Sequence, residues 1–188
     1  MNEVLNTIAK RFSCRGFDGK PVEKEKLELI TKAALQAPSG LNSQSLRVVI
    51  VQDKALIEDM DKESMLLLKN RPDQGAYNRF MERGGKIFYN APCLVLLLRP
   101  QEVPFDPTVD AGIMVQNIAL AATSLDVNNI IVAMGRLPFD TTKADEYKVK
   151  VGWKEGEQFV VGILLGYSDG LKDKEPHEID LNKITYID

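Results

Sequence analysis

The sequence predicts a fold in which helices cover a central sheet, of class α/β or α+β. Four short runs rich in Val, Ile and Leu, each bounded by turn residues, predict strands at 46–51, 93–98, 129–134 and 158–166. Segments with apolar residues at helical spacing lie between these runs. This alternation is typical of a sheet packed against helices. The length of 188 residues suits one domain, 1–188.

The helices are predicted from periodicity and from their end signals. A short amphipathic helix is expected at 3–10, with its apolar residues on one face. The next helix, 22–36, ends ahead of Pro38, because a proline disfavours helical backbone at the residue before it. Further helices are expected at 54–69, Tyr77–Tyr89 and 143–151, and a weak strand pattern lies at 184–187.

The longest apolar run, Asp106–Asp126, is predicted to be the central helix. Asp106 offers an acceptor for the free amides of the first turn, and Pro107 suits the first helical position. Asp110 lies in or near that turn, where the helix dipole favours an anion. Apolar residues cover nearly the whole circumference, which predicts burial on all sides. Either the helix is the core of a monomer, or a second subunit supplies part of its cover.

Composition excludes several classes of function. The net charge of −3 gives no indication of nucleic acid or an anionic membrane as a partner. The N-terminus has no apolar signal-peptide region, which predicts a cytoplasmic protein. The two cysteines, Cys14 and Cys93, form no metal or disulfide motif, and His177 is the only histidine. No glycine-rich dinucleotide or P-loop motif is present. With a single histidine, side-chain acid–base groups alone are not expected to perform the chemistry, which points to a cofactor.

Residues 11–15, RFSCR, form a candidate anion site. If this segment is extended, Arg11, Ser13 and Arg15 share one side, because strand side chains alternate. Two guanidinium groups and a hydroxyl would then converge on a phosphate, which arginine binds by paired, charge-assisted hydrogen bonds. The alternative is a solvated basic loop.

A second candidate lies in the loop APSGLNSQ at 37–44. Pro38 stops the preceding helix, and Gly40 permits positive φ. The amide groups of Asn42 and Gln44 both donate and accept hydrogen bonds, so they could recognise the edge of a heterocycle. The alternative is a turn stabilised by Ser39 and Asn42.

Four stretches together resemble the nitroreductase family of flavin mononucleotide (FMN) proteins. They are RFSCR at 11–15, APSGLNSQ at 37–44, the central helix with DAG at 110–112 and QN at 116–117, and LLGYSDGLKDK at 164–174. The resemblance extends over essentially the whole chain. It implies an α+β fold of the three-layer nitroreductase type, with a central mixed sheet flanked by helices. It also implies an interlocked homodimer with FMN at the interface.

The resemblance assigns the phosphate end of the cofactor. It implies that Arg11 and Ser13, with Phe12 between them, bind the FMN phosphate, and that Arg15 lies near the ribityl chain or the pyrimidine edge. Two lysines of the C-terminal segment, Lys172 and Lys174, would close on the phosphate. Their alternative role is a solvated tail, because acidic residues surround them.

The resemblance also assigns the ring end. Three residues of the 37–44 loop would approach the isoalloxazine from the partner subunit, and two would lie at the flavin pocket: Pro38, Ser39 and Gly40, then Asn42 and Gln44. Backbone amides of Ala133, Met134 and Gly135 would face flavin N5 and O4, with no certain catalytic side chain. Lys86 is a candidate for a positive charge near N1 and O2, and its alternative is a surface lysine.

The resulting hypothesis is an FMN-dependent oxidoreductase that uses NADH or NADPH. Hydride would reach a nitroaromatic, a quinone or a similar electrophilic small molecule by a ping-pong mechanism, through flavin N5. The alternatives are an FMN storage or carrier protein, a dehalogenase or enone reductase on the same scaffold, or a colourless α/β binding domain. Ser45-Leu46 and Met134 depart from the family pattern, so the acceptor is not predicted.

Overall fold

The computed structural model describes residues 2–103, 106–170 and 179–187. Its helices are α1 (Glu3–Lys10), α2 (Lys24–Leu35), α3 (Lys54–Lys69), α4 (Gly75–Glu82), α5 (Thr108–Ser124) and α6 (Ala144–Lys150). Short 3-10 segments are η1 (Gly40–Asn42), η2 (Ala133–Asp140) and η3 (Leu181–Lys183). The strands are β1 (Arg47–Val51), β2 (Cys93–Pro100), β3 (Asn128–Val132) and β4 (Glu157–Gly166). All four predicted strands are confirmed within two residues.

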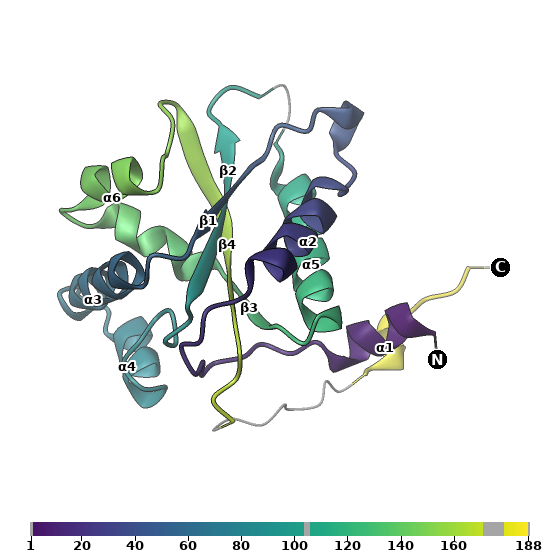
Figure 1. Ribbon diagram of the computed structural model, residues 1–188, viewed down its shortest axis with the longest axis horizontal. Helices are drawn as coiled ribbons and strands as arrows, with labels where there is room; N and C mark the ends of the chain where they lie inside the picture. The colour runs from purple at the N-terminus through teal and green to yellow at the C-terminus, as the bar shows by residue number, and fades with distance from the viewer. Residues whose placement is uncertain (1, 104–105, 171–178, 188) are drawn as a thin grey trace.

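The predicted class is confirmed, because helices cover both faces of one sheet. Figure 1 shows α3, α4 and α6 on one side of the sheet and α2 and α5 on the other. The strand order is β1-β2-β4-β3. Side chains of β2 alternate between the two layers. Leu94, Leu96 and Leu98 belong to the core under α3, whereas Val95 and Leu97 belong to the core under α5. Burial on both faces explains why this strand is a continuous apolar run.

The expected mixed sheet is wrong for the four strands, which pair only in antiparallel fashion. Two helices, α3 and α4, join β1 to β2, and the two strands pair antiparallel. The single helix α5 makes β2 and β3 parallel in direction, but β4 lies between them. The one parallel contact that the described residues make is an isolated bridge between Ser13 and Asn129.

The central helix is confirmed at Thr108–Ser124, with the amide of Thr108 donating to Asp106 at 3.0 Å. Its predicted burial on all sides is wrong for one chain. Ala111, Ile118 and their neighbours face α2 and the sheet, but Val109 is 72% exposed and Ile113 36% exposed. Val109 and Ile113 therefore lie on an outer face of α5 that the described chain leaves exposed.

Two weaker expectations are corrected at chain turns. The helix expected at Tyr77–Tyr89 is α4, Gly75–Glu82, and it ends where Gly84 and Gly85 adopt φ of 101° and 71°. These left-handed angles break a right-handed helix. Residues 184–187 form no strand in the described chain and lie exposed. Among the described residues, no helix has both the length and the apolar character needed to cross a bilayer.

Candidate functional site

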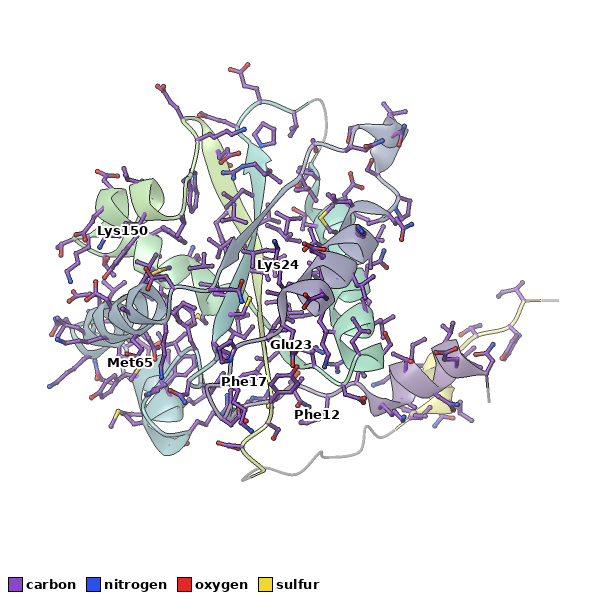
Figure 2. The ribbon with its side chains drawn as sticks, viewed as in Figure 1. Phe12, Phe17, Glu23, Lys24, Met65 and Lys150 are labelled. Carbon is purple, nitrogen blue, oxygen red and sulfur yellow. The ribbon has the colours of Figure 1, made fainter. Side chains whose placement is uncertain are left out.

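The RFSCR segment lies along β3, at the edge of the sheet. Ser13 pairs with Asn129, and the amide of Cys14 donates to the Asn129 carbonyl at 3.0 Å. Phe12 and Cys14 pack into the core under α3 and α4 (Figure 2 labels Phe12). Because side chains alternate along extended backbone, the two arginines fall on the other side with Ser13. Arg11 and Ser13 are half-buried and Arg15 is exposed, as a cationic site open to a ligand requires.

The thiol of Cys14 takes no part in this cationic side. It is buried and donates to the Gly16 carbonyl at 3.1 Å. Burial raises the pKa of Cys14, so the thiol stays protonated at neutral pH. A protonated, buried thiol is a packing group and not a nucleophile.

The end of β4 lies against the same segment. Phe17 bridges Ser168, and the amide of Asp169 donates to the Gly16 carbonyl at 3.2 Å. A Cβ at Gly16 would lie 2.5 Å from the Asp169 carboxylate, so a larger residue there would require the Asp169 side chain to move. The chain then enters residues 171–178. Lys172 and Lys174 lie outside the described residues, and their role stays a prediction.

Tyr167 fixes the turn after β4 to the start of α2. Its hydroxyl donates to the carboxylate of Glu23, which Figure 2 labels, and accepts from the ammonium of Lys26 at 3.0 Å. The ring also lies 5.2 Å from that ammonium, in cation–π contact. Burial raises the pKa of Tyr167, and the Glu23 hydrogen bond adds to the rise. The phenol therefore stays neutral as an anchor for residues 166–170.

Asn129 was missed by sequence reasoning. Its side chain is 1% exposed, and its amide nitrogen donates to the Ala119 carbonyl and to the Thr123 hydroxyl, both at 3.0 Å. Its Oδ1 is a buried acceptor that has no hydrogen-bond partner within the described chain. Asn129 also lines a cavity of about 260 Å³ beside Lys10 and Phe12. Such an orphaned acceptor fits a ligand that carries hydroxyl donors.

The turn after β3 lies farther along the same edge. At about 3.3 Å per residue, Ala133 is about 13 Å from Asn129 along the chain. Gly135 is buried, and a Cβ there would lie 3.4 Å from the ring of Phe159. Ala133 is exposed and Met134 half-buried. The Arg11–Arg15 segment and the 133–135 turn therefore lie at the two ends of one strand.

The loop at residues 38–44 has strained backbone. Leu41, Asn42 and Gln44 adopt φ of 52°, 55° and 45°, in the left-handed region that costs non-glycine residues of order 1–3 kcal/mol each. Internal hydrogen bonds hold the shape: the Gln44 amide donates to the Ser39 hydroxyl, and its side chain donates to Asn42 Oδ1, both at 3.0 Å. The turn predicted from Ser39 is thus present, with strain that marks candidate functional sites.

Asp110 anchors this loop, a contact that sequence reasoning did not predict. The Gly40 amide donates to both carboxylate oxygens of Asp110, each at 3.2 Å. Asp110 is 8% exposed and lies in the first turn of α5. The sequence placed an anion at this helix end but gave no sign of its partner, which lies 70 residues away in the chain.

One chain does not bring the two halves of the predicted site together. The loop at 38–44 is tied to the start of α5 through Asp110, whereas Asn129 is tied to its end through Thr123. At about 1.5 Å per residue, these two points of α5 are about 20 Å apart. Figure 1 shows η1 and β3 near opposite ends of α5.

Lys86 lies on a turn that Asn90 links to Phe17, two residues beyond the RFSCR segment. Its ammonium donates to Asn90 Oδ1 at 3.2 Å, and Asn90 donates to the Phe17 carbonyl at 3.1 Å. Buried Asp61 accepts from the amides of Ile87 and Phe88 at 2.7 and 3.2 Å. Burial raises the pKa of Asp61. Lys86 itself is exposed, as a surface lysine would be.

Comparison with known proteins identifies the family. The model of the nitroreductase family matches residues 8–167. The chain belongs to the nitroreductase family. This confirms the resemblance inferred from the four motifs.

Solved structures and curated relatives agree with this assignment. A nitroreductase with bound FMN from Desulfitobacterium hafniense DCB-2 is 42% identical, with a TM-score of 0.94 and 100% of both chains covered. The NADPH-flavin oxidoreductase of Vibrio harveyi is 26% identical over 185 residues, 94% of this chain and 70% of that protein. The FMN reductase (NAD(P)H) of Bacillus subtilis (strain 168) is 41% identical over 54 residues, 29% of this chain and only 22% of that protein.

Proposed function

We propose that this nitroreductase-family chain is an FMN-dependent oxidoreductase that uses NADH or NADPH. FMN, when bound, would accept hydride at N5 and return it to a nitroaromatic, a quinone or a similar acceptor in a ping-pong cycle. The observation that carries the proposal is the pairing of Ser13 with Asn129 on β3, with the 133–135 turn at the other end of the strand. The edge strand β3 thereby has the arginines of RFSCR near one end and the backbone amides of the 133–135 turn at the other.

The residues present fit FMN. Arg11 and Ser13 would bind the phosphate, since a dianion is held best by a guanidinium and a hydroxyl. Arg15 would lie near the ribityl chain. The orphaned, buried Oδ1 of Asn129 suits a hydroxyl donor on the same chain. Lys172 and Lys174 would add positive charge from the segment that follows Gly170.

The 133–135 turn would provide the polar contacts at the reacting end. Ala133, which is exposed, and Met134, which is half-buried, would offer backbone amide donors, and Phe159 supports the turn beneath Gly135. Amide dipoles and a nearby cation stabilise a negative charge that develops on a ring. Lys86 is the cation proposed for this role. The chain needs no catalytic histidine for such chemistry.

We infer that the functional unit is a homodimer with the cofactor at its interface. The loop at 38–44 lies about 20 Å along α5 from the phosphate side, so a second copy is the natural source of its contacts. The outer face of α5 and the apolar side chains of α1, with Val4 62% exposed and Leu5 49% exposed, need cover. Exposed apolar patches of this kind mark interfaces.

The first test is the visible spectrum of the purified protein, before and after heat release of any ligand. We expect a two-banded flavin spectrum, with close to one FMN per subunit. A colourless protein that fails to take up added FMN would refute the cofactor site.

A second test separates the enzyme from an FMN carrier. FMN-loaded protein should oxidise NADH or NADPH steadily when menadione or nitrofurazone is added, and the apoprotein should not. Bound flavin without steady turnover, over a panel of quinones and nitroaromatics, would favour storage. Turnover restricted to enones or halogenated aromatics would indicate a specialised reductase.

A further inference from the structure

The carboxylate of Asp110 is buried, which is unfavourable in free energy. Burial of a carboxylate costs several kcal/mol unless hydrogen bonds and charges compensate. Here the compensation comes from the first turn of α5 and from the Gly40 amide, which lies 3.2 Å from both oxygens. A neutral side chain at this third position of the helix would avoid burying a charge. The unusual feature is therefore the contact that Asp110 makes with the loop.

The loop needs such an anchor. Leu41 is 90% exposed and, with Asn42 and Gln44, has left-handed backbone. The hydrogen bonds inside the loop join Ser39, Asn42 and Gln44 to one another, so they fix its shape but not its direction. The Gly40–Asp110 contact joins the loop to α5. A cavity of about 150 Å³, lined by Pro38, Gln44, Asp110 and Met114 among others, separates the rest of the loop from the helix.

We propose that Asp110 is a positioning residue for the cofactor site. Its carboxylate holds Gly40, and through it the amide groups of Asn42 and Gln44, in the orientation that the ring of the partner's FMN requires. Asp110 does not itself touch the cofactor. The proposal rests on the proposed function, since it assigns a role to a loop of that site. It extends the site to the first turn of α5.

The test compares three variants. Asp110→Leu keeps the branched shape of the side chain, with methyl groups larger than the oxygens, and removes the acceptor. Asp110→Asn keeps one oxygen acceptor and removes the charge. Asp106→Asn is the matched control, because it removes an exposed carboxylate at the start of the same helix that accepts from Thr108 and does not contact the loop. For each variant we would measure FMN affinity, the visible circular dichroism of bound FMN, kcat and KM, and the melting temperature of the apoprotein.

We expect Asp110→Leu to weaken FMN binding at least tenfold and to change the visible dichroism of the bound ring. Asp110→Asn should restore affinity to within about threefold of wild type, because a carbonyl oxygen still accepts from Gly40. Asp106→Asn should keep wild-type affinity and dichroism. Amide hydrogen exchange at residues 40–44 of the apoprotein should be faster in Asp110→Leu and near normal in Asp110→Asn.

A role in stability alone would give a different pattern. If Asp110→Leu lowers the melting temperature but leaves FMN affinity, dichroism and loop exchange unchanged, the proposal is overturned. Equal loss of affinity in Asp110→Leu and Asp106→Asn would also overturn it. If Asp110→Leu does not fold, Asp110→Asn with unprotected 40–44 amides and normal FMN dichroism would contradict it as well. Failure of the wild type to bind FMN would instead refute the proposed function.

Discussion

At the scale of single residues, two buried carboxylates each hold a loop by accepting hydrogen bonds from its backbone. Asp61 and Asp110 each accept backbone amides from a loop with left-handed residues, and each loop carries a residue of the candidate site. Ser64, by contrast, is satisfied within its own helix by the Met60 carbonyl. A carboxylate that holds a loop far away in sequence is a long-range constraint that a local hydrogen bond does not provide.

Asp61 should make stability depend on pH. Burial raises its folded pKa above the ordinary value of 3.8, so the folded state binds more protons than the unfolded state between the two values. Its contribution is therefore fully present below the unfolded pKa and is lost as pH rises through the folded pKa. We expect the free energy of unfolding of the wild type, minus that of Asp61→Asn, to fall as the pH rises. Urea unfolding from about pH 4 to pH 7 measures both. A difference that is flat or grows with pH would contradict it.

Arg11 should act on the phosphate and not on the ring. Loss of a charge-assisted hydrogen bond costs about 1.5–3 kcal/mol, so Arg11→Ala should weaken FMN binding by roughly ten- to a hundredfold. Riboflavin, which lacks the phosphate, should bind the variant and the wild type equally. Lys20→Ala is the control for lost positive charge, because the Lys20 side chain is 77% exposed. Titration by flavin fluorescence measures each affinity, and an equal loss for riboflavin would count against phosphate binding.

At the scale of elements, sequence periodicity predicted most of the chain. Strands buried on both faces, such as Cys93–Pro100, are continuous apolar runs, and α3 was predicted at its observed bounds. The mixed sheet was a wrong expectation, because strand order depends on where β4 inserts and no local pattern encodes that. Extended backbone at residues 11–15 was the condition on which the sequence hypothesis depended, and the bridge between Ser13 and Asn129 was not predicted.

The candidate site was predictable only where its residues are contiguous in sequence. RFSCR and the 38–44 loop were identified by composition and by family resemblance. Left-handed angles at Leu41 and Gln44 could not be predicted, because neither residue type favours them. The Gly40–Asp110 contact depends on how α2 and α5 pack, so it required the structure.

The outer face of α5 gives a prediction at the same scale. Val109→Glu should weaken the proposed dimer at least tenfold, because burying a valine contributes about 1.5–3 kcal/mol and a buried charge costs more. Val149→Glu is the matched control. Val149 lies on α6, on the opposite side of the sheet, and is 79% exposed, against 72% for Val109. Sedimentation equilibrium measures both, and dissociation in both variants or in neither would refute the assignment of this face.

At the scale of the whole molecule, the exposed apolar surface lies on the same helix, α5, that separates the two halves of the candidate site. The loop at 38–44 is hydrogen-bonded to the start of α5, through Asp110, and Asn129 is hydrogen-bonded to its end, through Thr123. The outer face of the helix is exposed at Val109 and Ile113. A second copy packed there would complete both the core and the cofactor site. Oligomer formation and cofactor binding should therefore be linked, since a ligand that binds only the dimer stabilises it by mass action.

The C-terminal residues give the sharpest test of this linkage. Side chains in 179–187 are highly exposed, with Ile179 83%, Tyr186 83% and Ile187 90%. Apolar side chains gathered in this way indicate a surface that another chain covers. Truncation before Ile179 keeps Lys172 and Lys174 and should shift the protein toward the monomer. FMN content should fall with it, while far-ultraviolet dichroism stays unchanged, because 179–187 adds no residue to either core cluster.

The order of effects distinguishes linkage from direct contact. If the tail acts through the dimer, raising the protein concentration should restore FMN binding to the truncated chain, with the same midpoint in sedimentation and in flavin fluorescence. A truncated chain that stays dimeric but binds FMN weakly would place the tail in the cofactor site itself. A truncated chain that is dimeric with full FMN content would show that these exposed side chains serve neither purpose, and the open face of α5 would then have to account for the interface alone.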